Sequence, residues 1–407
     1  MKTVLPALEI RRLVAAVYLA LTAGTVFAGA AEQVAGTAAQ RAEPLLQVPL
    51  DWQESSDLFQ TWALRFTPAV QPFLKEPDFG RHRVVHGAFG CGVRTNEFLS
   101  FAWDQTANRL YLDVNGNRDL TDDTDASYAG EYDGFLQVFP RVKLGWNTPS
   151  GRHQYVVDLR LGGNIAEQLQ GNCTLRSFWQ GRVELAGRSY QIGLVENPDA
   201  RTATNEVAYL LFRAWDARTE PIRLNPGTPH LMSWSPSVYL AGQGFSVSSR
   251  YTNEAGSSRY LVELTPAQPP RGELLTGGKH LYRIVLSQSG GYTVVLDRPG
   301  PAEQIPVGTY ENAEIWLRQG AAEAFYLGPL RLIVRADASV LLETGGPLTN
   351  RVMVERRGDS LVLSYRLADS GRRALAYRLS NEDRNQPPGW TIRMGDREVA
   401  SGKFAYG

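Results

Sequence analysis

Hydrophobic and polar residues alternate in short runs along most of the chain after residue 50, and glycine, proline, asparagine and aspartate separate these runs. A period of two predicts β-strands, and the separating residues predict turns. The clearest predicted strands in the N-terminal part are residues 98–103, 109–113, 155–161, 182–185 and 189–195. Those in the C-terminal part are residues 281–286, 292–296, 314–318, 330–334, 351–355, 360–367, 374–379 and 390–394. We therefore expect an all-β protein, with antiparallel sandwich or barrel-like sheets first and one or two β-sandwich domains after them.

The first 30 residues follow a different pattern. Basic residues at Lys2, Arg11 and Arg12 precede an apolar run over residues 13–27 and then three small residues. This order is typical of a cleaved secretory signal peptide. The run is shorter than the roughly 20 residues that a membrane-spanning helix needs, which leaves an uncleaved anchor as the alternative. We expect export to the periplasm or the exterior, with no membrane insertion after cleavage.

Changes in composition divide the rest of the chain. Residues 31–50 lack an apolar period and are expected to form a tether, followed by a β domain over residues 51–265. Residues 266–278 are rich in proline and glycine and are expected to form a linker. Residues 279–407 then form a C-terminal β-sandwich region, with a possible subdivision near residue 345.

The domain over residues 51–265 contains an internal repeat. Thr-Asn-Glu at 95–97 precedes Ala-Trp-Asp at 102–104, and the same tripeptides recur at 204–206 and 214–216. Each copy later reaches a similar strand sequence that begins with tyrosine, at Tyr155 and at Tyr260. The repeat predicts a duplicated β domain, and a chance match is the alternative.

Length and charge restrict the class of protein. A chain of 407 residues is long enough for two or three domains, and 43% hydrophobic and 21% charged residues are ordinary for a globular protein. Lysine plus arginine and aspartate plus glutamate each number 42, and removal of residues 1–30 leaves the chain nearly neutral. Nucleic acids and anionic lipids are therefore not expected partners, because both require clustered positive charge.

Two cysteines, Cys91 and Cys173, remain after the signal peptide. An oxidising compartment permits a disulfide between them. Two separate buried thiols are an equal alternative, because cysteine is one of the most frequently buried residue types.

One segment carries a chemical motif. Oxygen-bearing side chains occupy alternate positions after residue 112, and an acidic pair follows them: Asp113, Asn115, Asn117, Asp119, Asp122 and Asp123. Calcium binds six to eight oxygen ligands, and a tight loop with such residues can direct them inward. Gly116 allows the turn, and position 119 can offer its carbonyl or its carboxylate. The sequence predicts a Ca²⁺ site, with a metal-free turn as the alternative because Asp and Asn also cap their own backbone.

The segment resembles the aspartate-rich calcium loops of EF-hands, dockerins and thrombospondin type 3 repeats. It differs from the EF-hand because Arg118 replaces the turn glycine, Thr124 replaces the bidentate glutamate, and the preceding residues predict a strand. A calcium-stabilised connection between strands is therefore expected. The second repeat has Asn225 and prolines in place of the acidic residues, so only the first copy is expected to bind.

Catalytic motifs are weak. His82 and His86 are spaced as a helical zinc pair, but residues 83–85 predict an extended chain. The Asp-Ser-Gly at 369–371 has no second copy, and residues 272–279 fail as a phosphate loop. We expect five tryptophans to be buried in the core, with stacking on sugar rings as the alternative: Trp52, Trp62, Trp103, Trp146 and Trp179.

The region from residue 110 to 123 also resembles uncharacterised exported proteins of environmental bacteria. Residues 281–334 resemble transthyretin-like or carboxypeptidase-regulatory-like sandwiches. These resemblances imply no activity. We expect a non-catalytic, calcium-stabilised module that binds a protein or glycan of the envelope or exterior. A secreted hydrolase of polysaccharide or peptide is the alternative.

Overall fold

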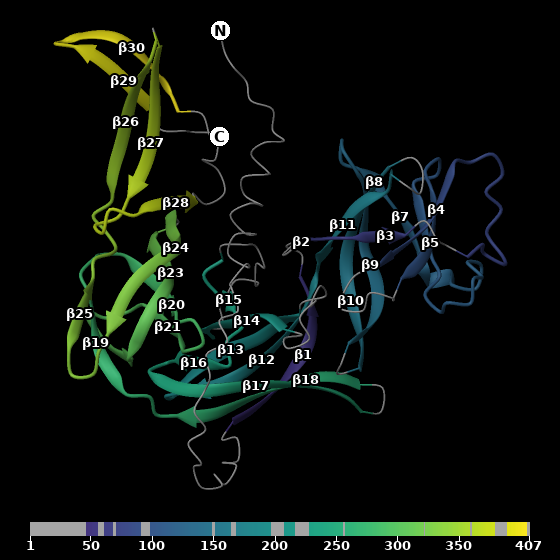
Figure 1. Cartoon of the computed structure of the whole chain (residues 1–407), viewed down its shortest axis with the longest axis horizontal. Helices are drawn as coiled ribbons and strands as arrows, with labels where there is room; N and C mark the ends of the chain where they lie inside the picture. Colours follow the sequence, from purple (N-terminus) through teal and green to yellow (C-terminus); the bar gives the residue numbers. More distant parts are fainter. Residues whose placement is uncertain are drawn as a thin grey trace, which may run out of the picture. The chain divides into compact units, whose positions relative to one another are not determined.

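The computed structural model describes residues 46–55, 61–67, 71–90, 98–148, 151–163, 168–196, 207–215, 228–254, 257–320, 322–358, 360–378 and 389–404. The expected all-β class is confirmed (Figure 1). The chain forms two compact units. The smaller unit takes its described residues from 350–366 and 378–404, and the larger one from 46–349 and 367–377.

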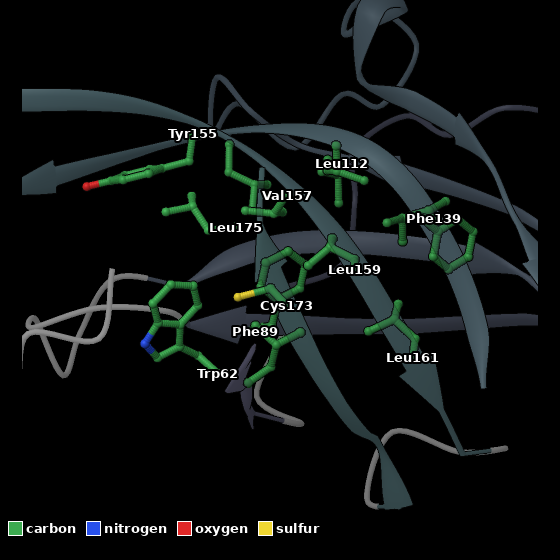
Figure 2. Packing of buried hydrophobic residues seen from close by; sticks show 14 of the residues in the cluster. Trp62, Phe89, Leu112, Phe139, Tyr155, Val157, Leu159, Leu161, Cys173 and Leu175 are labelled. Atoms are coloured by element: carbon green, nitrogen blue, oxygen red, sulfur yellow. The ribbon is translucent and has the colours of Figure 1, made fainter. Parts of the chain in front are cut away.

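One part of the larger unit is a β-sandwich, which follows the first strand in the sequence. Its first sheet has the order β2 (Thr61–Ala63), β11 (Gln170–Leu175), β10 (Gly151–Gly162), β9 (Gln137–Thr148) and β8 (Glu131–Tyr132). Its second sheet has the order β3 (Arg65–Thr67), β4 (Val84–Gly90), β5 (Leu99–Asp104), β6 (Arg109–Leu112) and β7 (Ser127–Ala129). Side chains from both sheets form one buried cluster. Figure 2 shows part of it, with side chains of β10 and β11 directed toward Phe89 and Leu112 of the other sheet.

Alternation in the sequence explains this core. Tyr155, Val157, Leu159 and Leu161 on β10 are spaced two residues apart, so all four lie on the same face of the sheet and are buried. Burial of such side chains contributes about 1.5–3 kcal/mol each relative to exposure.

A long sheet follows along the larger unit. Its first part has the order β15 (Leu231–Ser233), β14 (Val207–Ala214), β13 (Arg188–Glu196), β12 (Ser177–Leu185), β1 (Leu46–Glu54), β18 (Ser257–Ala267), β17 (Gln243–Glu254) and β16 (Ser237–Leu240). It continues with β21 (Thr293–Asp297), β20 (Leu281–Ser287), β23 (Gly308–Gln319), β24 (Ala322–Val334) and β28 (Ala374–Arg378). The first part encloses a second core cluster, to which Val285 and Val295 also contribute.

The third core cluster belongs to a C-terminal sandwich. Strands β20, β21, β23 and β24 pack here against a small sheet in the order β22 (Ala302–Pro306), β19 (Arg271–Thr276) and β25 (Ser339–Leu342). Strand β19 lies inside residues 266–278, where a linker was expected, and its Leu274 is fully buried. The glycines of this segment permit close packing, because a side chain at Gly272 would collide with the carbonyl of Arg335. This segment is therefore part of a sheet.

The smaller unit contains two pairs of strands. Strand β26 (Thr349–Arg357) lies beside β27 (Ser360–Ala368), and β29 (Gly389–Met394) pairs with β30 (Arg397–Lys403). Both β26 and β30 are exposed along their whole length. The division between the units, at Asn350, falls close to the break expected near residue 345.

Every strand predicted from the sequence corresponds to an observed strand, usually a longer one. Strand β1 begins at Leu46, within the final residues of the expected tether. None of the sheets formed by the described residues closes on itself. In the same part of the chain, no helix has the length and apolar character needed to cross a membrane.

Candidate functional site

The oxygen-rich segment connects two neighbouring strands. It leaves β6, passes through a short 3-10 helix, η1 (Thr124–Ala126), and returns in β7, which pairs with β6 at Leu110 and Tyr128. Leu120 is buried at 4% exposure and anchors the middle of the loop. A strand leads into the loop, as the sequence predicts, and the segment therefore joins strands and is not part of a helix-loop-helix.

Two residues of the loop have a left-handed backbone. Gly116 has a φ of 75°, which agrees with the turn expected there. Arg118 has a φ of 66°, an unfavourable conformation for a residue with a side chain. Arg118 is the position at which the EF-hand pattern has glycine, so the loop makes the same sharp turn without that residue.

Five side chains of the loop accept hydrogen bonds from the loop's own backbone, and three of them lie in its first half. Asn115 Oδ1 accepts from Asn117 N at 2.9 Å, and Asn117 Oδ1 accepts from Asp119 N at 2.7 Å. Asp113 Oδ2 accepts from Arg118 N at 3.2 Å. These bonds bend the chain around the alternate oxygen-bearing residues.

Asp113 is the most deeply buried of these acids, with 4% of its surface exposed. Its second oxygen, Oδ1, is buried and has no hydrogen-bond partner among the described residues. A buried carboxylate oxygen without a donor or a cation is unfavourable. Within this loop, that oxygen is a buried acceptor that a bound cation would satisfy.

Asp123 lies close to the other acids. Its Oδ2 accepts from Val114 N at 3.2 Å. Burial raises the pKa of Asp123, and the negative charges of Asp122, Asp113 and Asp119 raise it further. The ionised loop is therefore electrostatically strained, and a bound cation would relieve this repulsion.

The remaining acids differ in orientation. Asp122 accepts from the side-chain amides of Asn117, at 2.6 Å, and Asn115, at 3.3 Å. Asp119 is held by Thr121, whose hydrogen bonds lower the pKa of its carboxyl group, and lies 3.6 Å from Lys75 Nζ. Hydrogen bonds thus join Asp122 to two asparagines, whereas the carboxylate of Asp119 is held by Thr121, which leaves its backbone carbonyl as the group it can offer.

The acidic side chains of the loop are not arranged in a complete coordination shell. Among the described residues, no three His, Cys, Asp or Glu side chains stand close enough together to hold a metal ion as they are. The donor set of carboxylates, amide oxygens and carbonyls nevertheless has the chemistry that calcium prefers. The hydrogen bonds between Asp122 and the asparagine amides would have to exchange for contacts with the ion.

A separate segment fixes the loop from outside. Leu74 N and Lys75 N both donate to the carbonyl of Arg118, at 2.8 and 3.3 Å, and Leu120 N donates to the carbonyl of Lys75 at 3.0 Å. Arg118 Nη1 also donates to Gln71 Oε1 at 3.2 Å. The loop is therefore attached to this segment at its centre, and strands β6 and β7 hold its ends.

A second polar cluster surrounds Glu196, which was not identified from the sequence. Glu196 and His153 are each 1% exposed, and His153 Nδ1 lies 2.5 Å from Glu196 Oε1. Trp179 Nε1 donates to Glu196 Oε2 at 2.9 Å. The hydroxyl groups of Tyr260 and Tyr155 donate to Oε1 at 3.2 and 3.5 Å. The partners come from β10, β12 and β18, so this carboxylate on β13 connects the first sandwich to the long sheet.

Two partners of Glu196 have equivalent positions in the sequence repeat. Tyr155 and Tyr260 each begin the strand sequence that the two copies share, and both donate to the same carboxylate. The ring of Tyr251 lies 3.8 Å from the ring of His153. One signal in the sequence could have revealed this cluster. Glu196 is an acid that directly follows the apolar strand residues 192–195.

The other candidate residues of the sequence occupy ordinary positions. His82 Nδ1 lies 2.6 Å from Asp104 Oδ2, and His86 Nε2 lies 3.1 Å from Glu76 Oε1. Cys173 is buried and Cys91 lies outside the described residues, so their pairing stays a prediction. The tryptophans at positions 62, 103 and 179 are buried as expected, whereas Trp52 is 40% exposed. The side chain at position 146 and the whole of Asn225 lie outside the described residues.

Comparison with known proteins identifies no relative. No protein-family model matches the chain, and searches for similar curated proteins and solved structures find no significant match. The functional argument therefore rests on the residues themselves.

Proposed function

We propose that this chain is an exported β-sheet protein in which Ca²⁺ stabilises the loop between β6 and β7. Its role would be that of a non-catalytic module that binds a protein or glycan of the cell envelope or exterior. The observation that carries the calcium assignment is the buried Oδ1 of Asp113, to which no described residue donates a hydrogen bond. Export is supported by the signal-like order of residues 1–30 in the sequence.

The proposed ligands follow from the contacts of the loop. Asp113, Asn115, Asn117, Asp122 and Asp123 would supply side-chain oxygens, and Asp119 would supply its carbonyl. The bound ion would cancel the repulsion that raises the pKa of Asp123. Magnesium fits less well, because it requires an octahedron and retains its waters. Zinc is disfavoured, because the loop has neither histidine nor cysteine.

Calorimetry and thermal melting of the mature protein test the calcium site. We expect binding heat with Ca²⁺ and a higher melting temperature in Ca²⁺ than in excess chelator. At a free ion concentration about 100 times Kd, the gain is about 2.7 kcal/mol. Asp113→Asn should abolish most of this gain, because it removes the buried charge. Asp125→Asn is the matched control, since Asp125 is an exposed acid on η1 next to the loop.

The calcium assignment fails if the wild-type melting curves coincide in Ca²⁺ and in chelator and no binding heat is measured. It also fails if Asp125→Asn and Asp113→Asn reduce the response equally. Export is tested separately by fractionation of the producing cells and N-terminal sequencing of the mature protein. Screening of the calcium-loaded protein against glycan arrays and envelope extracts tests the binding role.

A further inference from the structure

Arg283 lies in the middle of the long sheet, and its side chain has no exposed surface. On β20 it pairs directly with Asp297 of β21 and with Trp316 of β23. Directly paired residues of antiparallel strands lie on the same face of a sheet. Val285, two residues further along that face, packs in the second core cluster. A guanidinium group is therefore buried on a face that also carries Asp297, Val285 and Glu314.

Among the described residues, only one of the three guanidinium nitrogens of Arg283 has a hydrogen-bond partner. Arg283 Nη1 donates to Asp297 Oδ1 at 2.6 Å. Nε and Nη2 have no hydrogen-bond partner among the described residues. These two nitrogens form the edge of the group that can bind two oxygens of one acid side by side. Buried charged donors without an acceptor are costly, so the edge points to an acceptor that the described residues do not supply.

The same chain shows how such an edge is normally used. Arg176 donates from Nε to Asp158 Oδ1 at 2.5 Å and from Nη2 to Asp158 Oδ2 at 2.9 Å. Arg176 is partly exposed, with 18% of its side chain accessible, yet both nitrogens are satisfied. Arg283 is more deeply buried, and no carboxylate in the described part of the chain binds the same edge.

The surroundings of Arg283 leave its charge incompletely neutralised. Burial raises the pKa of Glu314 to about 7, although Arg283 acts in the opposite direction. Glu314 is therefore partly protonated at neutral pH. Burial also lowers the pKa of His230 to about 2, with further lowering by Arg283, Arg213 and Arg318. His230 is thus neutral, and the local field is positive.

Two further nitrogen atoms of residues that pair or interact with Arg283 have no hydrogen-bond partner in the described part of the chain. They are Trp316 Nε1, on the residue that pairs with Arg283, and His230 Nδ1. The cluster also reaches the surface, since His230 and Glu314 are half-buried and the Asp297 side chain is 29% exposed.

We propose that the Nε–Nη2 edge of Arg283 binds a small oxyanion, and that its ligand is a carboxylate of an organic acid or acidic sugar. Two coplanar oxygens match the two parallel donors, as they do at Arg176. Inorganic phosphate shares part of this chemistry and is the competing source. The proposal does not depend on the calcium loop.

Titration calorimetry on the full chain tests the site, with acetate, glucuronate and inorganic phosphate as probes and chloride at equal ionic strength as the blank. We expect saturable binding of a carboxylate. Arg283→Lys keeps the charge but loses the two-donor edge, and it should weaken binding by about tenfold or more. Arg250→Lys, at an exposed guanidinium group, should leave binding unchanged.

Trp316→Phe provides a second variant in case Arg283→Lys fails to fold. It retains a ring against Phe325 but removes the N–H, and it should also weaken binding. Glu314→Gln tests whether Glu314 is the missing acceptor. If Glu314 fills the edge itself, this variant will be as unstable as Arg283→Lys and the wild type will bind no probe.

That result would overturn the proposal. Unchanged affinity in both Arg283→Lys and Trp316→Phe would also overturn it. Preference for phosphate over both carboxylates would overturn the ligand class.

Discussion

Replacement of Glu196 by alanine should destabilise the larger unit severely. The carboxylate accepts from Trp179 at 2.9 Å and from Tyr260 at 3.2 Å, and it lies 2.5 Å from His153. A buried donor that loses its acceptor costs about 1–3 kcal/mol. Three such partners therefore give a loss of at least about 3 kcal/mol, before the cavity is counted. A typical domain is stable by only about 5–15 kcal/mol, so the variant would be close to unfolding.

Urea denaturation at neutral pH, followed by far-ultraviolet circular dichroism, measures this loss. Glu184→Ala is the matched control, because Glu184 is an acid on β12 with 60% of its side chain exposed, and its removal should change stability by at most about 0.5 kcal/mol. Tyr260→Phe should cost about 1 kcal/mol alone. Its effect should shrink in the Glu196→Ala background, because the bond that it removes is then already absent.

A loss of less than about 1 kcal/mol in Glu196→Ala would refute this reasoning, since the three donors would then have found other partners without cost. Additive effects of Glu196→Ala and Tyr260→Phe would refute the specific bond between these residues.

Three further predictions concern the loop and the sheets. Because the pKa of Asp123 is raised in the folded state, Asp123 contributes stability at low pH, and this contribution is lost as the pH rises from 3.8 through the raised pKa. In chelator, the wild type should therefore lose stability over this pH range relative to Asp123→Asn. Thermal melting at a series of pH values measures the difference. Identical pH profiles would contradict the repulsion. Arg118→Gly should stabilise the chelated protein by about 1 kcal/mol in urea titration, because glycine adopts the positive φ without strain, and a loss of stability would mean that the Gln71 contact matters more. Gly193→Ala should prevent accumulation of soluble protein, because its Cβ would collide with the carbonyl of Trp179 on β12, and normal yield and melting would contradict that packing.

The course of the loop between β6 and β7 was the part of the candidate site most accessible to prediction. Its signal is local: oxygen-bearing residues at alternate positions bend the chain through their own backbone hydrogen bonds, as Asn115 and Asn117 do. The ion pair between Asp119 and Lys75 was not predictable, because Lys75 comes from 44 positions away in the sequence.

The sequence by itself determined the strands. Alternation of apolar residues, as at Tyr155, Val157 and Leu159, decides locally which side chains can share a buried face. The linker predicted from composition at residues 266–278 was wrong, because glycine is common both in flexible linkers and where two backbones pack closely. Only the tertiary structure, which places the carbonyl of Arg335 against Gly272, shows that this glycine serves close packing.

Only the tertiary structure decided which strands pair and which polar residues are buried. Glu196 meets partners from other strands, as far as 64 positions away at Tyr260. Arg283 occupies a core-facing position whose burial depends on the strands packed around it. Such contacts arise from strand pairings between distant segments, and these pairings are set by packing of the whole sheet, a property that no short stretch of sequence contains.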